Sequence, residues 1–250
     1  MTEVRNGLQI IRSEKLSMQG LVFGMSTRHG GVSPSPLGLN LSFNVGDDPA
    51  NVRKNRALFF GELNIPLDRL AFPMQEHSAG VLRIDEPGRY SSCDALTTNK
   101  SDVYLCISAA DCVPVFLYDR ARKAIAGIHA GWRGTAAGIV RGALECMRRE
   151  FSTDVRDLIA FIGPSADKCC YVVGPDVAGA FNAKFSHVKD GSSTVDLKGA
   201  NRQQLLDAGV PADSIEVSPL CTISESHLLH SYRRDGAQSG RMLAVLGLRS

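Results

Sequence analysis

A cysteine and a histidine stand at the ends of two neighbouring apolar runs in the middle of the chain. Cys112 precedes the run Val113–Tyr118, and His129 follows the run Ala124–Ile128. Both runs are short, rich in branched residues and separated by a basic turn around 120–123, which predicts two adjacent buried strands. We therefore expect the two side chains to meet at a sheet edge, where a thiol and an imidazole could bind a metal ion or act as a nucleophile and base.

His77 adds a second imidazole. It follows the apolar segment 70–73, again where a strand is expected to give way to a turn. Two imidazoles and one thiolate leave a fourth position for water or substrate, which is typical of catalytic rather than structural zinc. The plainer alternatives are a packing role for Cys112 and a carbonyl-bonded His129. Asp94 could orient a metal-bound histidine or simply cap a turn.

The segment after His129 combines glycines with an arginine. Two glycines bracket Trp132–Arg133, which permits a tight turn from strand to helix, and backbone amides at a helix start can bind an anion. A planar guanidinium binds phosphate or carboxylate oxygens bidentately. The candidates for that task, with a solvated surface as the alternative for each, are Arg28, Arg133, Arg233 and Arg234. His29 is either a substrate contact or a solvated loop residue.

The remaining histidines and cysteines have less informative surroundings. His187 is expected to be exposed, and His227 and His230 are expected at the surface. Vicinal cysteines such as Cys169 and Cys170 cannot both point into one site from a regular strand, so Cys170 is either a core filler or a reactive group. An odd total of seven cysteines, with no CxxC pair, indicates free thiols in a reducing compartment.

Composition narrows the class of protein. The 250 residues are 44% hydrophobic and 22% charged, which fits one large α/β domain over residues 1–250 because no linker divides the chain. No apolar run reaches the roughly 18 residues of a membrane span, and the first ten residues lack the order of a signal peptide, so we expect a cytoplasmic protein without a membrane partner. With a net charge of +2 and dispersed basic residues, a nucleic-acid partner is not indicated.

Strands and helices alternate along the predicted chain. A Gly/Pro-rich loop from Arg28 excludes a helix until Asp48 and Pro49 supply an N-cap and a first-turn proline. Further strands are expected between 70 and 129, and the last strand is expected to complete the sheet. The other expected elements are helices at 50–63, 135–151, 175–185 and 197–208, and strands at 20–27, 158–162, 214–217 and 242–248.

Over nearly its whole length the chain resembles the laccase-domain family, whose members are known both as multicopper polyphenol oxidases and as purine nucleoside phosphorylases. One departure is Val172, where the family commonly has an acidic residue. The segments that carry the resemblance are Thr27–Ser33, Leu39–Ser42, Gly46–Pro49, Gln75–Ser78, Ala109–Pro114, His129–Thr135, Ile162–Ser165, Cys170–Tyr171, Cys221–Thr222 and Ser231–Arg234.

The resemblance implies a single-domain layered α/β/α sandwich with mixed sheets, similar to bacterial toxins with a Cys–His hydrolase site. It implies zinc held by His77, Cys112 and His129. It also implies phosphorolysis of adenosine, guanosine, inosine and methylthioadenosine, and deamination of adenosine. The expected partners are therefore a nucleoside and phosphate.

The oxidase label fits the residues less well. A multicopper oxidase needs on the order of ten histidines, whereas this chain has six and no HxH pair. A single His/Cys/His site could still take copper, because Cu(II) binds most such sites more tightly than Zn(II).

Two other functions remain as alternatives. Cys112 and His129 could form a nucleophile–base pair for hydrolysis, and editing of cell-wall precursors, proposed for bacterial members of the family, would suit that chemistry. A non-enzymatic binding module is disfavoured, because a docking surface does not require an open metal site.

Each nucleoside reaction assigns roles to particular residues. In deamination, a zinc-activated water attacks purine C6, and Asp111 is the candidate acid for the leaving ammonia. In phosphorolysis, an anion pocket must hold phosphate beneath ribose C1′, and the candidates are Arg28, Arg133 and Arg233.

Overall fold

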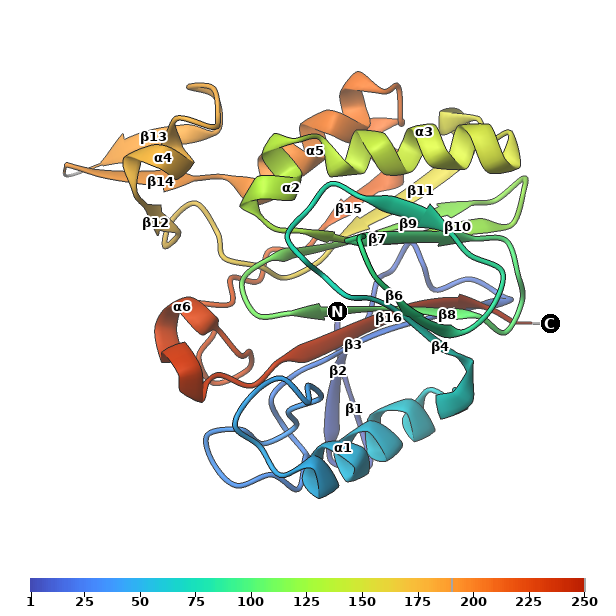
Figure 1. Ribbon diagram of the computed structural model, residues 1–250, viewed down its shortest axis with the longest axis vertical. Coiled ribbons are helices and arrows are strands. Elements are labelled where there is room, and N and C mark those ends of the chain that lie inside the picture. The colour runs from blue at the N-terminus through green and yellow to red at the C-terminus, as the bar shows by residue number, and fades with distance from the viewer. Residues whose placement is uncertain (190, 250) are drawn as a thin grey trace.

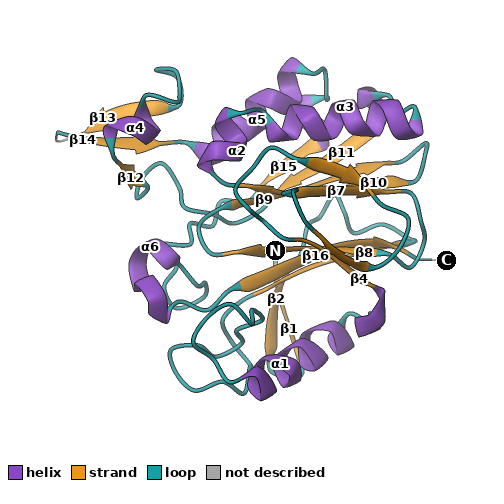
Figure 2. Ribbon diagram, viewed as in Figure 1, coloured by secondary structure: helices purple, strands orange, loops and turns teal. Residues whose placement is uncertain are grey.

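Two β-sheets lie face to face at the centre of the molecule, and helices cover their two outer faces (Figure 1). The computed structural model describes residues 1–189 and 191–249. An α/β fold with mixed sheets is thus confirmed. The centre, however, holds two sheets, so the layers run α/β/β/α rather than α/β/α (Figure 2).

The first sheet has seven strands, and the last strand of the chain lies in its middle. β16 pairs antiparallel with β3 on one side and with β8 on the other, whereas β4 runs parallel to both β8 and β6. The expectation of a final strand in the sheet is confirmed. In spatial order the strands are β1 (Thr2–Arg5), β2 (Leu8–Ile11), β3 (Leu21–Ser26), β16 (Met242–Leu248), β8 (Tyr104–Ala109), β4 (Leu70–Pro73) and β6 (Gly88–Tyr90).

The second sheet has six strands and contains the hairpin predicted from the two apolar runs. In this hairpin His129 is paired with Pro114 and Ala130 with Val113. Every residue of both strands is buried, which explains why the runs are apolar without alternation. The spatial order is β15 (Ile215–Val217), β11 (Leu158–Ile162), β9 (Val113–Asp119), β10 (Ala124–Ala130), β7 (Ala95–Thr98) and β5 (Val81–Arg83).

Three apolar layers hold the elements together. Between the sheets, Phe23 meets Phe116 and Phe161 edge-on, with ring centroids 5.4 and 4.9 Å apart. Helix α1 (Pro49–Glu62) packs two buried phenylalanines against the outer face of the seven-stranded sheet. Helices α3 (Ile139–Phe151) and α5 (Leu197–Asp207) cover the six-stranded sheet. Among the described residues, no helix is long and apolar enough to cross a membrane.

The helices at 50–63 and 197–208 are confirmed within a residue or so, and the Asp48 carboxylate accepts a hydrogen bond from Ala50 N at the start of α1. The expected helix at 135–151 is wrong at its start. A short helix α2 (Trp132–Ala136) ends first, and Gly138, with φ 82°, turns the chain before α3 begins. Glycine adopts that left-handed conformation without a Cβ clash.

The expected helix at 175–185 is wrong beyond its first turn. Only α4 (Pro175–Ala178) is helical. It lies between strands of a small sheet, whose spatial order is β12 (Val172–Val173), β14 (Ser192–Val195) and β13 (Ser186–Lys189). His187 in this sheet is exposed, as expected. The remaining short helices are α6 (Tyr232–Asp235) and 3-10 turns at Leu67–Arg69, Val155–Asp157, Ala212–Ser214 and Gly236–Gln238.

Candidate active site

Three side chains that are distant in the sequence converge at one place. The ligand atoms of His77, Cys112 and His129 all lie within 4.8 Å of one another. Cys112 Sγ lies 3.8 Å from His77 Nε2, and the two imidazole rings stand nearly perpendicular with their centroids 5.0 Å apart. The expected meeting of Cys112 and His129 at the end of the β9–β10 hairpin therefore takes place, and His77 joins them.

A buried carboxylate builds the turn that carries His77. The backbone N–H groups of Glu76, His77 and Ser78 all donate to Asp94, at 3.1, 3.0 and 2.7 Å. The turn needs this support because His77 has a positive φ of 59°. The turn-capping role considered for Asp94 is thus present.

The same carboxylate orients the second imidazole. His129 Nδ1 lies 2.7 Å from an Asp94 oxygen that has no exposure to solvent, so His129 presents its Nε2 to the other two side chains. Burial raises the pKa of Asp94, but hydrogen bonds from His129 and Ser78 outweigh it and lower this pKa to about 2. Asp94 is therefore ionised and performs both of the tasks that the sequence left open.

Without a metal, the thiol and the imidazole stabilise each other's charge. Burial raises the pKa of Cys112, but the charge and hydrogen bond of His129 outweigh it and lower this pKa to about 6. For His129, burial lowers the pKa, whereas Cys112 and Asp94 raise it to about 9. The thiolate required of either a metal ligand or a nucleophile is thus favoured near neutral pH.

Gly131 lies so close to this group that a side chain here would be tightly packed against it. A Cβ at this position would stand 3.0 Å from His77 Cδ2 and 3.3 Å from Cys112 Sγ. The strand-to-helix turn predicted here is present, since α2 begins at Trp132. Because α2 has only five residues, its dipole is small, and arginine side chains are the stronger anion-binding groups nearby.

A cavity of about 800 Å³ opens over the three side chains. This volume is in the range of pockets that bind small molecules. Five arginines line it, together with aromatic rings on which a flat base could stack. The lining side chains of these two kinds are Arg56, Arg89, Arg133, Arg233 and Arg241, and Phe43, Phe72, Trp132, Tyr171 and Tyr232.

Two of the predicted substrate-binding arginines line the cavity. The Arg133 guanidinium lies 4.3 Å from the Trp132 ring, and that of Arg233 lies 5.3 Å from the Tyr171 ring. Each guanidinium group lies against an aromatic ring, and both groups line the same cavity. Arg133 and Arg233 thus remain candidates for binding an anionic substrate.

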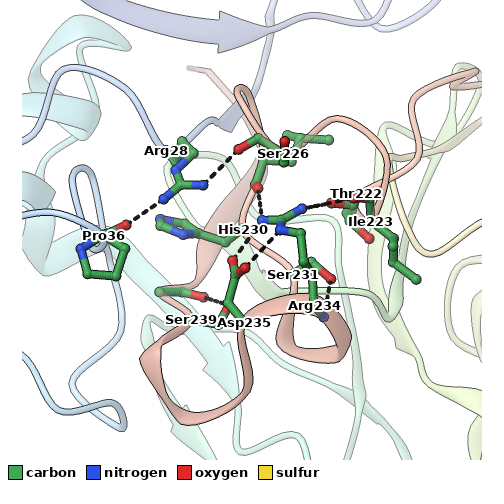
Figure 3. Close-up of polar contacts among 12 residues, drawn as sticks. Arg28, Pro36, Thr222, Ile223, Ser226, His230, Ser231, Arg234, Asp235 and Ser239 are labelled. Atoms are coloured by element: carbon green, nitrogen blue, oxygen red, sulfur yellow. Dashed lines mark hydrogen bonds and ion pairs between the residues drawn. The ribbon is translucent and has the colours of Figure 1, made fainter.

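Arg28 and His29 do not join the predicted site residues around this cavity. Neither lines the cavity. Arg28 donates to the carbonyls of Ser226 and Pro36, at 2.7 and 2.8 Å (Figure 3). The His29 ring contacts the carbonyl of His227. These hydrogen bonds connect the loop of Arg28 and His29 to the segment 226–227. The two side chains therefore link loops of the protein.

Arg234 and His230 also differ from expectation. The Arg234 guanidinium donates to the Thr222 carbonyl and pairs with Asp235, so it is not free for substrate (Figure 3). The expectation of a surface position is wrong for His230, which has no exposure, whereas His227 is exposed. Burial lowers the pKa of His230 to about 3, so this imidazole is neutral.

Asp111 lines the cavity, but its carboxylate is engaged in the structure. One oxygen accepts a hydrogen bond from Thr222 Oγ1 and the other from Arg233 N, both at 2.6 Å. Both carboxylate oxygens are thus occupied by donors of the protein itself. The structure therefore gives Asp111 a positioning task, which is to hold the start of α6 and with it Arg233.

Residues 22–249 match the family model described as multi-copper polyphenol oxidoreductase laccase. The chain belongs to this family. A purine nucleoside phosphorylase of Bacteroides thetaiotaomicron is 38% identical over 242 residues, covering 88% of each chain. The adenosine deaminase RL5 of an unknown prokaryotic organism is 36% identical over 255 residues, covering 93% of this chain and 97% of that protein.

A solved structure of the same family has the same fold. The crystal structure of YlmD from Geobacillus stearothermophilus superposes with a TM-score of 0.92 at 33% identity, covering 99% of this chain and 98% of that one. A protein named purine nucleoside phosphorylase YlmD from the same organism is 35% identical over 249 residues.

The donor atoms of this laccase-family chain fit a single ion at the cavity better than several coppers. In the described part of the chain, potential metal ligands gather in two groups of three, and only the group at the cavity contains histidine. A blue-copper site and a trinuclear cluster together need on the order of ten histidines, but this group has two. The family name therefore does not describe the ligands at this site.

Three further arginines of the cavity were not predicted from the sequence, namely Arg56, Arg89 and Arg241. Arg56 projects from α1 over the rings of Phe43 and Phe72, at 4.6 and 5.0 Å, and Arg241 lies 5.2 Å from the Tyr232 ring. Burial lowers the pKa of both guanidinium groups. Arg56 stands in an ordinary helical segment, so no local signal in the sequence marks it.

Proposed function

We propose that the protein is a zinc-dependent purine nucleoside phosphorylase that also deaminates adenosine, and that His77, Cys112 and His129 hold the ion. The observation that carries this proposal is the position of these three ligands beneath a cavity lined by arginines and aromatic rings. The relatives named for the two activities, each similar over most of the chain, support the choice of substrate.

The three side chains fit a zinc ion in donor type, number and charge. One thiolate and two imidazoles leave a fourth position that faces the cavity, and Asp94 fixes the orientation of one imidazole. When bound, the ion supplies Lewis-acid polarisation of a reactant oxygen. Copper is the second candidate for the same ligands, because nitrogen and sulfur donors bind Cu(II) strongly.

In phosphorolysis, a phosphate oxygen forms a bond to ribose C1′ while the bond between C1′ and the purine nitrogen breaks. The electron pair leaves with the purine, which takes up a proton. We assign phosphate binding to Arg133 and Arg233, because guanidinium groups pair with phosphate oxygens bidentately. Asp111 positions Arg233 through its backbone, and Trp132 and Tyr171 offer faces for the base.

In deamination, water adds at purine C6 and ammonia leaves. This reaction attacks a different atom, so the nucleoside must enter in a second orientation. A cavity of about 800 Å³ has room for both orientations, since pockets of roughly 300 to 1,000 Å³ accept drug-sized ligands.

A panel of nucleosides with and without phosphate tests the proposal. We expect phosphate-dependent release of hypoxanthine from inosine, and a loss of kcat/KM of roughly 10- to 150-fold in Arg133→Ala and in Arg233→Ala, since a hydrogen bond to a charged group contributes about 1.5–3 kcal/mol. Arg122→Ala, in the exposed turn between β9 and β10, is the control. Full activity in both cavity variants would remove these arginines from the proposal.

A Cys–His hydrolase is the second candidate, because the thiolate of Cys112 is stabilised beside His129. Such an enzyme would form an acyl-Cys112 intermediate. Mass spectrometry of the metal-free protein after incubation with activated esters and cell-wall peptides separates the candidates. An acyl group on Cys112 that turns over supports the hydrolase, whereas an unmodified thiol supports a ligand role.

A further inference from the structure

A second group of sulfur atoms lies outside the cavity. Cys169, Cys170 and Cys221 place their Sγ atoms within 4.8 Å of one another, and none of the three lines the cavity. All three are free thiols. Cys169 is exposed, Cys170 is half-buried and Cys221 is buried, so the group extends from the interior to the surface.

The two adjacent cysteines converge because they lie in a turn. The N–H groups of Cys170 and Tyr171 both donate to the Asp167 carbonyl, at 2.9 and 2.8 Å. The objection that neighbouring side chains point to opposite faces holds for a strand and not for this turn. The Sγ atoms of Cys169 and Cys170 are 3.0 Å apart.

The segment that carries Cys221 is fixed to this turn by contacts that involve no thiol. Thr222 N donates to the Ser165 carbonyl at 3.0 Å. The buried ammonium of Lys198 pairs with the Asp167 carboxylate at 2.8 Å and donates to the Ser218 carbonyl at 3.0 Å. The three sulfurs are therefore brought together by a rigid frame before any ligand binds.

Polar groups surround the buried sulfur. Asp167 N donates to Cys221 Sγ at 3.4 Å. Amide donors around a sulfur stabilise the thiolate, which is the form that binds a metal.

We propose that Cys169, Cys170 and Cys221 form a second metal site, which binds Zn²⁺ through three thiolates and leaves the fourth position to water. Soft sulfur donors select such an ion, and binding releases the thiol protons. Tetrahedral Zn–S bonds of about 2.3 Å place sulfurs roughly 3.8 Å apart. The three sulfurs already lie within 4.8 Å of one another, and those of Cys169 and Cys170, now 3.0 Å apart, would separate slightly on binding. A disulfide would use only two of the thiols, whereas an ion uses all three.

The proposed site adjoins the wall of the cavity. Tyr171, which follows Cys170, lines the cavity, and Thr222, which follows Cys221, donates to Asp111. An ion bound by the three cysteines would thus tie together the two segments that support this wall. A fourth position filled by water is more usual in catalytic zinc sites, but we assign this site a structural role, because its ligands lie in these two segments and none of them lines the cavity.

Counting bound ions tests the proposal. The reduced, metal-free full-length protein is titrated with Zn²⁺ against a chromophoric chelator. We expect two ions per chain in the wild type, one in Cys169→Ser and in Cys221→Ser, and one in Cys112→Ser. The control Cys146→Ser, which alters a buried cysteine of α3 outside both groups, retains two. With Co²⁺, the sulfur charge-transfer band of the Cys112→Ser protein should disappear on adding Cys221→Ser.

Three results would overturn the proposal. They are an ion count that is the same in the wild type, Cys169→Ser and Cys221→Ser, the absence of any ion in Cys112→Ser, and a disulfide among the three cysteines in protein purified without reductant. Cys169 is exposed, so Cys169→Ser keeps the test valid if Cys221→Ser fails to fold. Ion counts do not depend on turnover, so failure of the phosphorylase proposal leaves this test unaffected.

Discussion

Asp94 supports both imidazoles of the cavity site with one side chain. Its carboxylate accepts hydrogen bonds from the turn around His77 and from the ring of His129. A carboxylate in this position fixes the histidine tautomer and increases its basicity as a ligand. Asp94 thus controls the geometry of both imidazoles of the proposed metal site.

Replacing Asp94 with asparagine should weaken metal binding. The amide keeps one acceptor but has no charge, so we expect Zn²⁺ affinity to fall roughly 10- to 100-fold. Competition with a chelator measures this. Asp213→Asn, an exposed carboxylate in a surface turn, is the matched control and should bind as the wild type does. Equal affinities for the two variants would contradict the role of Asp94.

The Cys112 thiol of the metal-free protein should react at unusually low pH. Its pKa of about 6 means that the thiolate persists until the pH falls through about 6, and only then does alkylation slow. Cys93, whose pKa burial raises to about 11, is the internal comparison and should stay unreactive. Peptide-mapped iodoacetamide labelling from pH 5 to 9 measures both. A midpoint near the ordinary thiol value of roughly 8.5 would contradict this prediction.

At the scale of elements, the β9–β10 hairpin and the α2 turn were predictable, and the break before α3 was not. Strands that are buried on both faces consist of apolar residues without alternation, so the runs 113–118 and 124–128 could be recognised as strands from the sequence. The helix pattern of 135–151 continues through Gly138, and only the backbone conformation there shows that the chain turns. The β1–β2 hairpin turns at Asn6–Gly7, where both φ values are positive, at 46° and 81°, and such an Asn-Gly pair is a hairpin signal that can be read in the sequence.

The α2 turn makes a prediction of its own. Gly131→Ala should displace the ligands, because the new methyl group would lie 3.0 Å from His77 Cδ2. The neighbours must move by a few tenths of an ångström. Since a misplacement of about 1 Å can cost on the order of 100-fold in rate, we expect kcat to fall by about 3- to 10-fold while the protein stays folded.

The control for this variant is Gly61→Ala in α1, where nothing lies within 4 Å of the added methyl group. It should leave activity unchanged and raise stability by up to about 1 kcal/mol, because alanine favours a helix. Thermal melts and phosphorolysis rates of both variants measure these effects. Wild-type kcat in Gly131→Ala would contradict the close approach described here.

At the scale of the whole molecule, the site depends on how two sheets stack. The turn of His77 follows a strand of the seven-stranded sheet, whereas His129 lies in the six-stranded sheet. The sequence indicated the chemical types and the strand ends, and those predictions hold. It could not place Arg28 away from the cavity or Arg56 within it, because both depend on contacts between segments far apart in the chain.

The most direct test of the account is the cleavage of inosine by protein of known metal content. We predict equal amounts of hypoxanthine and ribose 1-phosphate, formed only when phosphate is present, lost when the metal is removed and restored by Zn²⁺. Cleavage at the same rate without phosphate, or by the metal-free protein, would contradict the central claim that the three-ligand site and the arginines of the cavity act together.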